Sequence, residues 1–118
     1  MAIRNVTQRN AMATAYGAAA PYGALFTGDP GVADAATNEV TGGSPAYARK
    51  ALNWGTAATS AITGTATFDV PSGTTVTYFG VTVLGTAGVA NVRDSVAVTS
   101  QAFASQGTYA VTATYTQT

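Results

Sequence analysis

Histidine and cysteine are both absent from this chain of 118 residues. Without histidine the commonest general base of enzymes is missing, and without cysteine neither a disulfide framework nor a soft metal site can form. Charge is scarce as well, because basic and acidic residues together make up 8% of the chain, against about 25% in an average globular domain. The formal net charge is zero, and such a surface favours association over a free monomer.

The low content of charged residues also limits which classes of partner the chain can bind. No basic stripe is present that could displace counterions from phosphates, so we expect no nucleic-acid partner. No long apolar run is present either, so we expect no membrane span. Arg4 and Arg9 are followed by alanine-rich, polar sequence instead of a leucine- or valine-rich segment, which predicts no signal peptide and assembly in the cytoplasm of the producing cell.

The acidic residues do not form a recognisable site in the sequence. They are Asp29, Asp34, Glu39, Asp69 and Asp94. None follows the spacing of a calcium loop, and acids in turns most often accept local hydrogen bonds. Gly42-Gly43 lacks the lysine of a phosphate-binding loop. We therefore predict no enzymatic activity, no metal and no cofactor.

Apolar residues make up 47% of the chain, which is enough for one packed domain. Residues 60–70 and 107–118 alternate cleanly between apolar and polar side chains, and glycine-rich turns separate further segments of this kind. About six strands at this spacing predict a mainly β protein, an antiparallel β-sandwich of jelly-roll or immunoglobulin-like type. The further strands are expected at 22–27, 47–54, 74–84 and 93–103. Within 74–84 the alternation changes phase, which indicates two buried faces or a bulge at Gly80.

One short helix is expected over residues 5–19. Asn5 can cap it with Gln8 three residues later, and Gly17 and Pro21 bracket its end. The helix either packs on its own domain or docks on a neighbouring subunit. We divide the chain into a helical arm, 1–20, and a β-sandwich domain, 21–118. The predicted core consists of Leu52, Trp54, Phe68, Tyr78 or Phe79, Val81, Val96 and Val111.

Residues 39–54 carry the most informative pattern. The glycines and proline of Gly42-Gly43-Ser44-Pro45 break the chain before an alternating segment that places Leu52 and Trp54 on one side. Arg49 and Lys50 are adjacent, so they point to opposite faces of a strand. Arg49 either pairs internally with Glu39 or Asp69 and holds down the long loop, 31–46, or pairs across a subunit joint.

The same residues carry a resemblance. The order Gly42-Gly43, Tyr47-Ala48-Arg49, Phe68-x-Val70-Pro71 and Tyr78-Phe79-Gly80 resembles a family of short structural proteins of tailed bacteriophages, described as tail fibre or minor tail proteins. The match covers Tyr22 to Leu84. Some small virion proteins of similar design decorate capsids.

The resemblance implies a non-enzymatic virion subunit that acts through subunit contacts, with a capsid decoration protein or a receptor- or carbohydrate-binding module at a fibre tip as alternatives. Expected partners are other virion proteins and further copies of the chain, with a trimer as the first expectation; a host surface glycan stays open. The contacts are assigned to the helix, the 31–46 loop and an edge strand. The candidate interface residues are Val6, Arg9, Tyr16, Glu39, Tyr47, Arg49 and Lys50.

Overall fold

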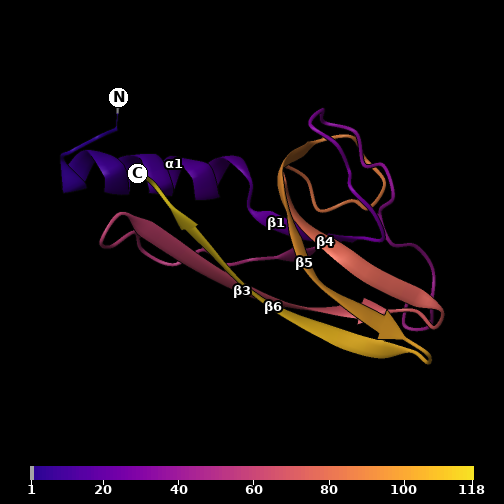
Figure 1. Cartoon of the computed structure of the whole chain (residues 1–118). Coiled ribbons are helices and arrows are strands. Elements are labelled where there is room, and N and C mark those ends of the chain that lie inside the picture. Colours follow the sequence, from indigo (N-terminus) through magenta and orange to yellow (C-terminus); the bar gives the residue numbers. More distant parts are fainter. Residues whose placement is uncertain (1) are drawn as a thin grey trace.

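The chain opens with a helix, α1 (Val6–Ala19), in a computed structural model that describes residues 2–118 (Figure 1). The predicted cap is present, since the backbone N–H of Gln8 donates to Oδ1 of Asn5 at 3.1 Å. Ala13 and Gly17 form the buried face. A Cβ atom at Gly17 would lie 2.8 Å from Cδ1 of Ile62, so the glycine lets the helix approach the β-structure closely. Within residues 2–118 no helix is long and apolar enough to cross a membrane.

Six strands follow, and every pair is antiparallel. They are β1 (Tyr22–Phe26), β2 (Lys50–Ala51), β3 (Ala61–Val70), β4 (Thr74–Thr82), β5 (Val92–Phe103) and β6 (Gly107–Thr116). One sheet has the order β2-β1-β4-β5, and the other pairs β3 with β6 over their full length. The predicted mainly β fold with one N-terminal helix is confirmed. The strand expected over 47–54 is reduced to β2, because the chain around it bends to bridge the two sheets.

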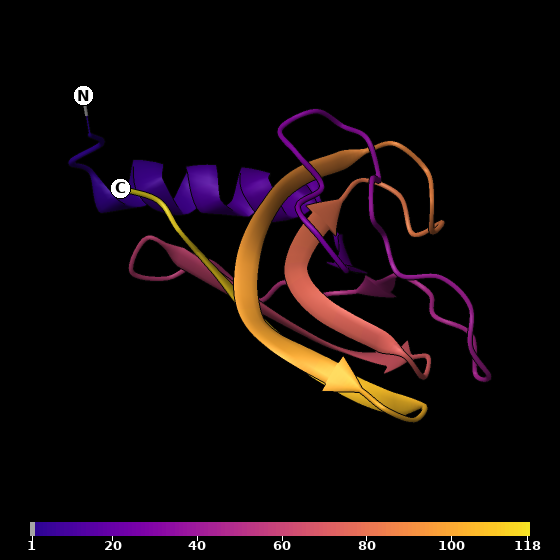
Figure 2. The same cartoon turned by 45° about the vertical axis from the view of Figure 1, so that its right-hand side comes forward.

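The two sheets are hydrogen-bonded to each other on one side only. The backbone of Leu52 donates to Pro21 and accepts from Thr65, and Gly55 donates to Thr63, with N···O distances of 2.9–3.0 Å. Backbone pairing therefore runs from β6 through β3, residues 52–55, β1 and β4 to β5. It stops there, since β5 and β6 do not pair. Figure 2 shows these two strands diverging from the short loop that joins them. We call the side between β5 and β6 the open seam.

The main core lies between the sheets. It contains Leu25, Leu52, Phe68, Phe79 and Val81, all buried. A second cluster on the outer face of the four-stranded sheet contains Ala24, Phe26 and Val92, with Tyr78 and Ala36 packed against it. Phe79 and Tyr78 thus point to opposite faces. Val76 lies in the main core with Phe79, because the register shifts between Val76 and Tyr78, and this shift accounts for the phase change in the strand.

Three core predictions need correction. Trp54 and Val111 are only partly buried, although both pack against the main core. Val96 is 58% exposed, because it lies on an edge strand at the open seam where nothing covers it. The expected irregularity in β4 is not at Gly80, which pairs regularly with Ser95; the register shifts lie between Val76 and Tyr78 and after Val81.

Candidate functional site

A buried charged network lies where the 31–46 loop meets the loop after β4. Arg49 donates from Nε and Nη2 to the two carboxylate oxygens of Glu39 at 2.9 and 2.8 Å, and the two side chains are 0% and 2% exposed. Its Nη1 donates to Leu84 O and Asn91 Oδ1, and its Nη2 also donates to Val89 O, at 2.8–3.1 Å. All five N–H donors of the guanidinium are therefore used.

The carboxylate of Glu39 accepts two further hydrogen bonds. Tyr47 Oη and the backbone N–H of Gly88 each donate to its carboxylate at 2.8 Å. Burial alone would raise the pKa of Glu39, but the hydrogen bonds from Arg49, Gly88 and Tyr47 outweigh it and hold the pKa below its usual value. Burial and the charge of Glu39 raise the pKa of Tyr47 above its usual range. The carboxylate is thus ionised and the phenol neutral, so Tyr47 acts as a donor while its oxygen accepts from Leu25 N at 3.0 Å.

The network decides between the two roles left open for Arg49. The internal pair with Glu39 is present and holds the 31–46 loop against the loop of residues 83–91. Asp69 takes no part in it. Because the side chains of Glu39, Tyr47 and Arg49 are inside the chain, they can serve an interface only by fixing the loops that surround them. Their interface role stays a prediction, as does that of the half-buried Lys50 on β2.

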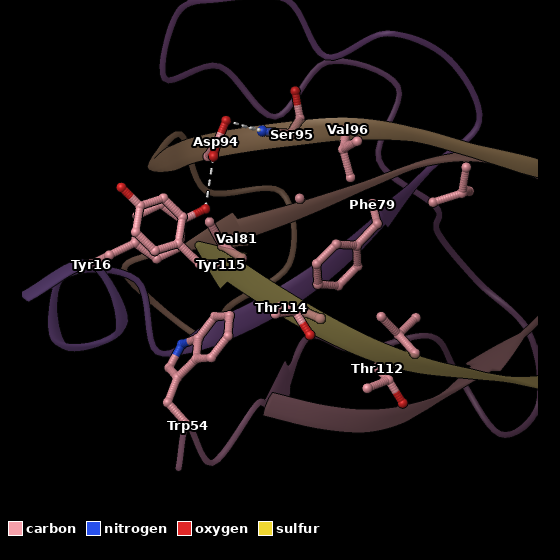
Figure 3. A pocket seen from close by; sticks show the side chains of 14 residues that line it. Tyr16, Trp54, Phe79, Val81, Asp94, Ser95, Val96, Thr112, Thr114 and Tyr115 are labelled. Carbon is pink, nitrogen blue, oxygen red and sulfur yellow. Dashed lines mark hydrogen bonds between the residues drawn. The ribbon is translucent and has the colours of Figure 1, made fainter. Parts of the chain in front are cut away.

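The open seam contains an apolar groove of about 350 Å³ (Figure 3). Val96 and Val98 of β5 form one wall, and Val111 and Ala113 of β6 form the other. Phe79 lies on the floor between them. The groove is therefore the part of the space between the two sheets that no backbone pairing closes.

Aromatic side chains close one end of this groove. Tyr16 of α1 stacks on Tyr115 of β6 with ring centroids 3.8 Å apart, and its ring meets Trp54 edge-on at 6.1 Å. Tyr16 Oη donates to Oδ2 of Asp94 on β5 at 2.7 Å (Figure 3). Burial and the hydrogen bond to Asp94 raise the pKa of Tyr16 above its usual range, so it stays a neutral donor. One helical residue thus joins α1 to both edges of the seam.

Sequence reasoning found part of this arrangement. Among the candidate interface residues, the structure brings Glu39, Tyr47 and Arg49 together and places Tyr16 at the groove. Val6 is exposed on α1 and Arg9 is half-buried there, and neither is joined to the other candidates. No pattern in the sequence connects Asp94 with Tyr16, which lies 78 residues away. The position of Tyr115 could be predicted only from the alternation, which places its side chain on the same face of the strand as Val111 and Ala113. No metal-binding cluster of acids is found among residues 2–118.

Comparison with known proteins gives one family. The family described as podophage GP4 fiber I protein gp80 matches residues 1–117. No curated protein and no solved structure matches. The family match spans nearly the whole chain, including the helix and the C-terminal strands that the sequence resemblance left out, and it confirms the tail-fibre type. The chain therefore belongs to the podophage GP4 fiber I protein gp80 family and is a structural component of a bacteriophage tail fibre.

Proposed function

We propose that the chain works without turnover or cofactor, as a building block that joins copies of itself and other virion proteins into the fibre. One observation carries this proposal: each element assigned to subunit contacts displays large apolar side chains to solvent. Val6 and Met12 are exposed on α1, Val32 in the 31–46 loop and Val96 on β5. An exposed apolar side chain gains free energy when a partner removes it from water, so these residues are where we expect subunit contacts.

The adjoining 83–91 loop adds Leu84 and Val89, which are also exposed. Their backbone carbonyls are the ones that Arg49 binds. The buried network therefore holds an apolar surface in place from below. Presenting side chains on a fixed backbone lowers the ordering entropy that binding would otherwise cost. In this way Arg49 and Glu39 support a contact surface without reaching it.

The body is elongated, with extents of 47 × 24 × 23 Å. We infer that identical copies pack around an axis, because closed cyclic symmetry is the commonest arrangement of identical subunits. A trimer is the expected stoichiometry, and assembly takes place in the host cytoplasm before the fibre joins the virion. The mass of the assembled subunit in solution, measured by sedimentation, tests the stoichiometry.

A carbohydrate-binding role finds no support in the aromatic cluster of the groove. The polar atoms that would orient a sugar are bonded within the chain: Tyr16 Oη to Asp94, Trp54 Nε1 to Ala20 O, and Tyr115 Oη to Gln117. We therefore keep the assembly role as the proposal.

Val6→Glu in the phage tests the assembly proposal directly. Val6 is exposed, so the change should leave the fold intact while placing a charge on the contact surface of α1. We expect the variant protein to fold but to be depleted from purified particles, as measured by immunoblot. Thr7→Glu, one position along the helix, is the matched control for added charge. Normal incorporation of Val6→Glu would contradict the role of α1.

A further inference from the structure

We propose that the open seam is the contact with a second copy of this chain, in which the β5 edge of one copy pairs with the β6 edge of the next. This deepens the proposed function and rests on it. The contact would continue the backbone pairing that stops at β5 and β6, and it would cover the apolar groove between them.

Both edges of the seam are long, and their only charges, Arg93 and Asp94, lie at the end of β5 that Tyr16 closes. β5 spans Val92–Phe103 and β6 spans Gly107–Thr116, so at ~3.3 Å per residue they offer about 40 Å and about 33 Å of edge. Edge strands in natural proteins are usually blunted by lysine, proline or other charges. From Ser95 to Thr118 the sequence contains no charged residue and no proline. Nothing in the side chains therefore opposes the addition of another strand.

Val96 faces the core side of its sheet, yet no other part of the described chain covers its side chain. It is the pairing partner of Phe79 across β4 and β5, so the two side chains share the core face of the sheet. Phe79 is 5% exposed, whereas Val96 is 58% exposed. Val98, Val111 and Ala113 line the same groove and are only partly buried. Core-facing side chains are thus exposed or only partly buried along β5 and β6, the edge strands of the two sheets.

The electrostatics of the groove favour a second copy as the occupant. Its lining contains one carboxylate, Asp94, which already accepts from Tyr16 Oη. A negatively charged partner segment would find no counter-charge there, and a positively charged one would meet only Asp94, which Tyr16 already engages. From Ser95 to Thr116 the β5–β6 region is extended and uncharged and consists mostly of small and β-branched residues, so this part matches the groove in charge and in backbone conformation. A β5-to-β6 contact joins two different surfaces and can close into a ring, as the expected trimer requires.

Val96→Lys tests the proposal. The side chain is largely exposed in the single chain, so the lysine should fold normally, which circular dichroism would check. In the proposed contact its charge would be buried without a partner. We expect the dissociation constant of the assembly to rise by about 100-fold or more in sedimentation experiments.

Ala97→Lys is the matched control for Val96→Lys. It adds the same charge to the same strand on the opposite face, where Ala97 is the partner of Tyr78. We expect it to associate like the wild type. A wild-type chain that stays monomeric at its highest soluble concentration would overturn the proposal, and so would a Val96→Lys chain that associates like the Ala97→Lys control.

Cross-linking tests the pairing itself, because the protein contains no cysteine. A Val96→Cys chain is mixed with an Ala113→Cys chain, because both positions face the core side of their strands, and treated with a short thiol-reactive cross-linker. We expect a mixed dimer. Thr56→Cys, beside the side that residues 52–55 close, replaces Ala113→Cys in the control and should give none. A mixed dimer no more abundant than in this control would refute the β5-to-β6 contact.

The two proposals can fail separately. If Val96→Lys assembles normally while Val6→Glu is excluded from particles, the seam proposal is wrong and the assembly role of the exposed surface stands. If both variants are incorporated normally, both proposals fall.

Discussion

Replacement of Arg49 by alanine should remove a large part of the stability of the fold. The change deletes all five hydrogen bonds of the guanidinium and leaves the carboxylate of Glu39, 2% exposed, without a counter-charge. Breaking a buried ion pair from one side costs about 3–5 kcal/mol. A domain of this size is stable by about 5–15 kcal/mol, so Arg49→Ala should be close to the limit of folding.

Urea unfolding followed by circular dichroism measures this cost. With a slope of about 1–3 kcal/mol per molar urea, the midpoint should fall on the order of 2 M. The double variant Arg49→Ala/Glu39→Gln should recover part of the loss, because the unpaired buried charge is gone. That recovery separates the charge effect from the loss of packing.

The second ion pair of the described chain supplies the control. Arg93 and Asp34 approach to 2.7 Å, but their side chains are 47% and 58% exposed. Exposed pairs contribute about 0–1 kcal/mol, so Arg93→Ala should unfold close to the wild-type midpoint. If Arg49→Ala costs no more than Arg93→Ala, the network does not hold the loops as we argue.

Three further predictions concern stability. The pKa of Glu39 is held below 4.5, so its stabilising effect is complete above about pH 4.5 and is lost as the pH falls through the lower, folded-state pKa. Glu39→Gln should reduce this loss of stability at acid pH, measured as the free energy of unfolding in urea at several pH values. Gly64→Ala should cost about 1–3 kcal/mol in urea unfolding, because the new Cβ would lie 2.9 Å from the backbone oxygen of Leu52; an unchanged midpoint would show that the strands can move apart. Asn5→Ala should remove the helix cap and lower the free energy of unfolding by about 1 kcal/mol in thermal melts, and equal melting curves would contradict it.

Local patterns predicted the elements well. The helix cap at Asn5 and the alternation over residues 61–70 each depend on a few neighbouring residues, and both appear where expected. The resemblance carried by Tyr47-Ala48-Arg49 and its companions also pointed to the tail-fibre type that the family match shows. The cap and the alternation could be predicted because each depends only on residues within one element.

Contacts between segments that are distant in the chain could not be predicted from the sequence. Alternation placed Val96 on a core-facing parity, which is correct, but parity does not reveal that β5 is an edge strand with nothing beyond it. The bond between Tyr16 and Asp94 joins segments from opposite halves of the chain. The bridging of both sheets by residues 52–55 likewise depends on how the whole fold closes, so a strand predicted over 47–54 became the two-residue β2.

The most direct test of the assembly claim is a density map of the fibre in the intact virion, into which the chain is fitted. We predict several copies around a common axis, with α1, the 31–46 loop and the open seam at the joints between neighbours. Figure 1 shows the helix and the loop at separate places on the body, so a fit can distinguish them. A map in which Val6, Val32 and Val96 all face solvent would contradict the account.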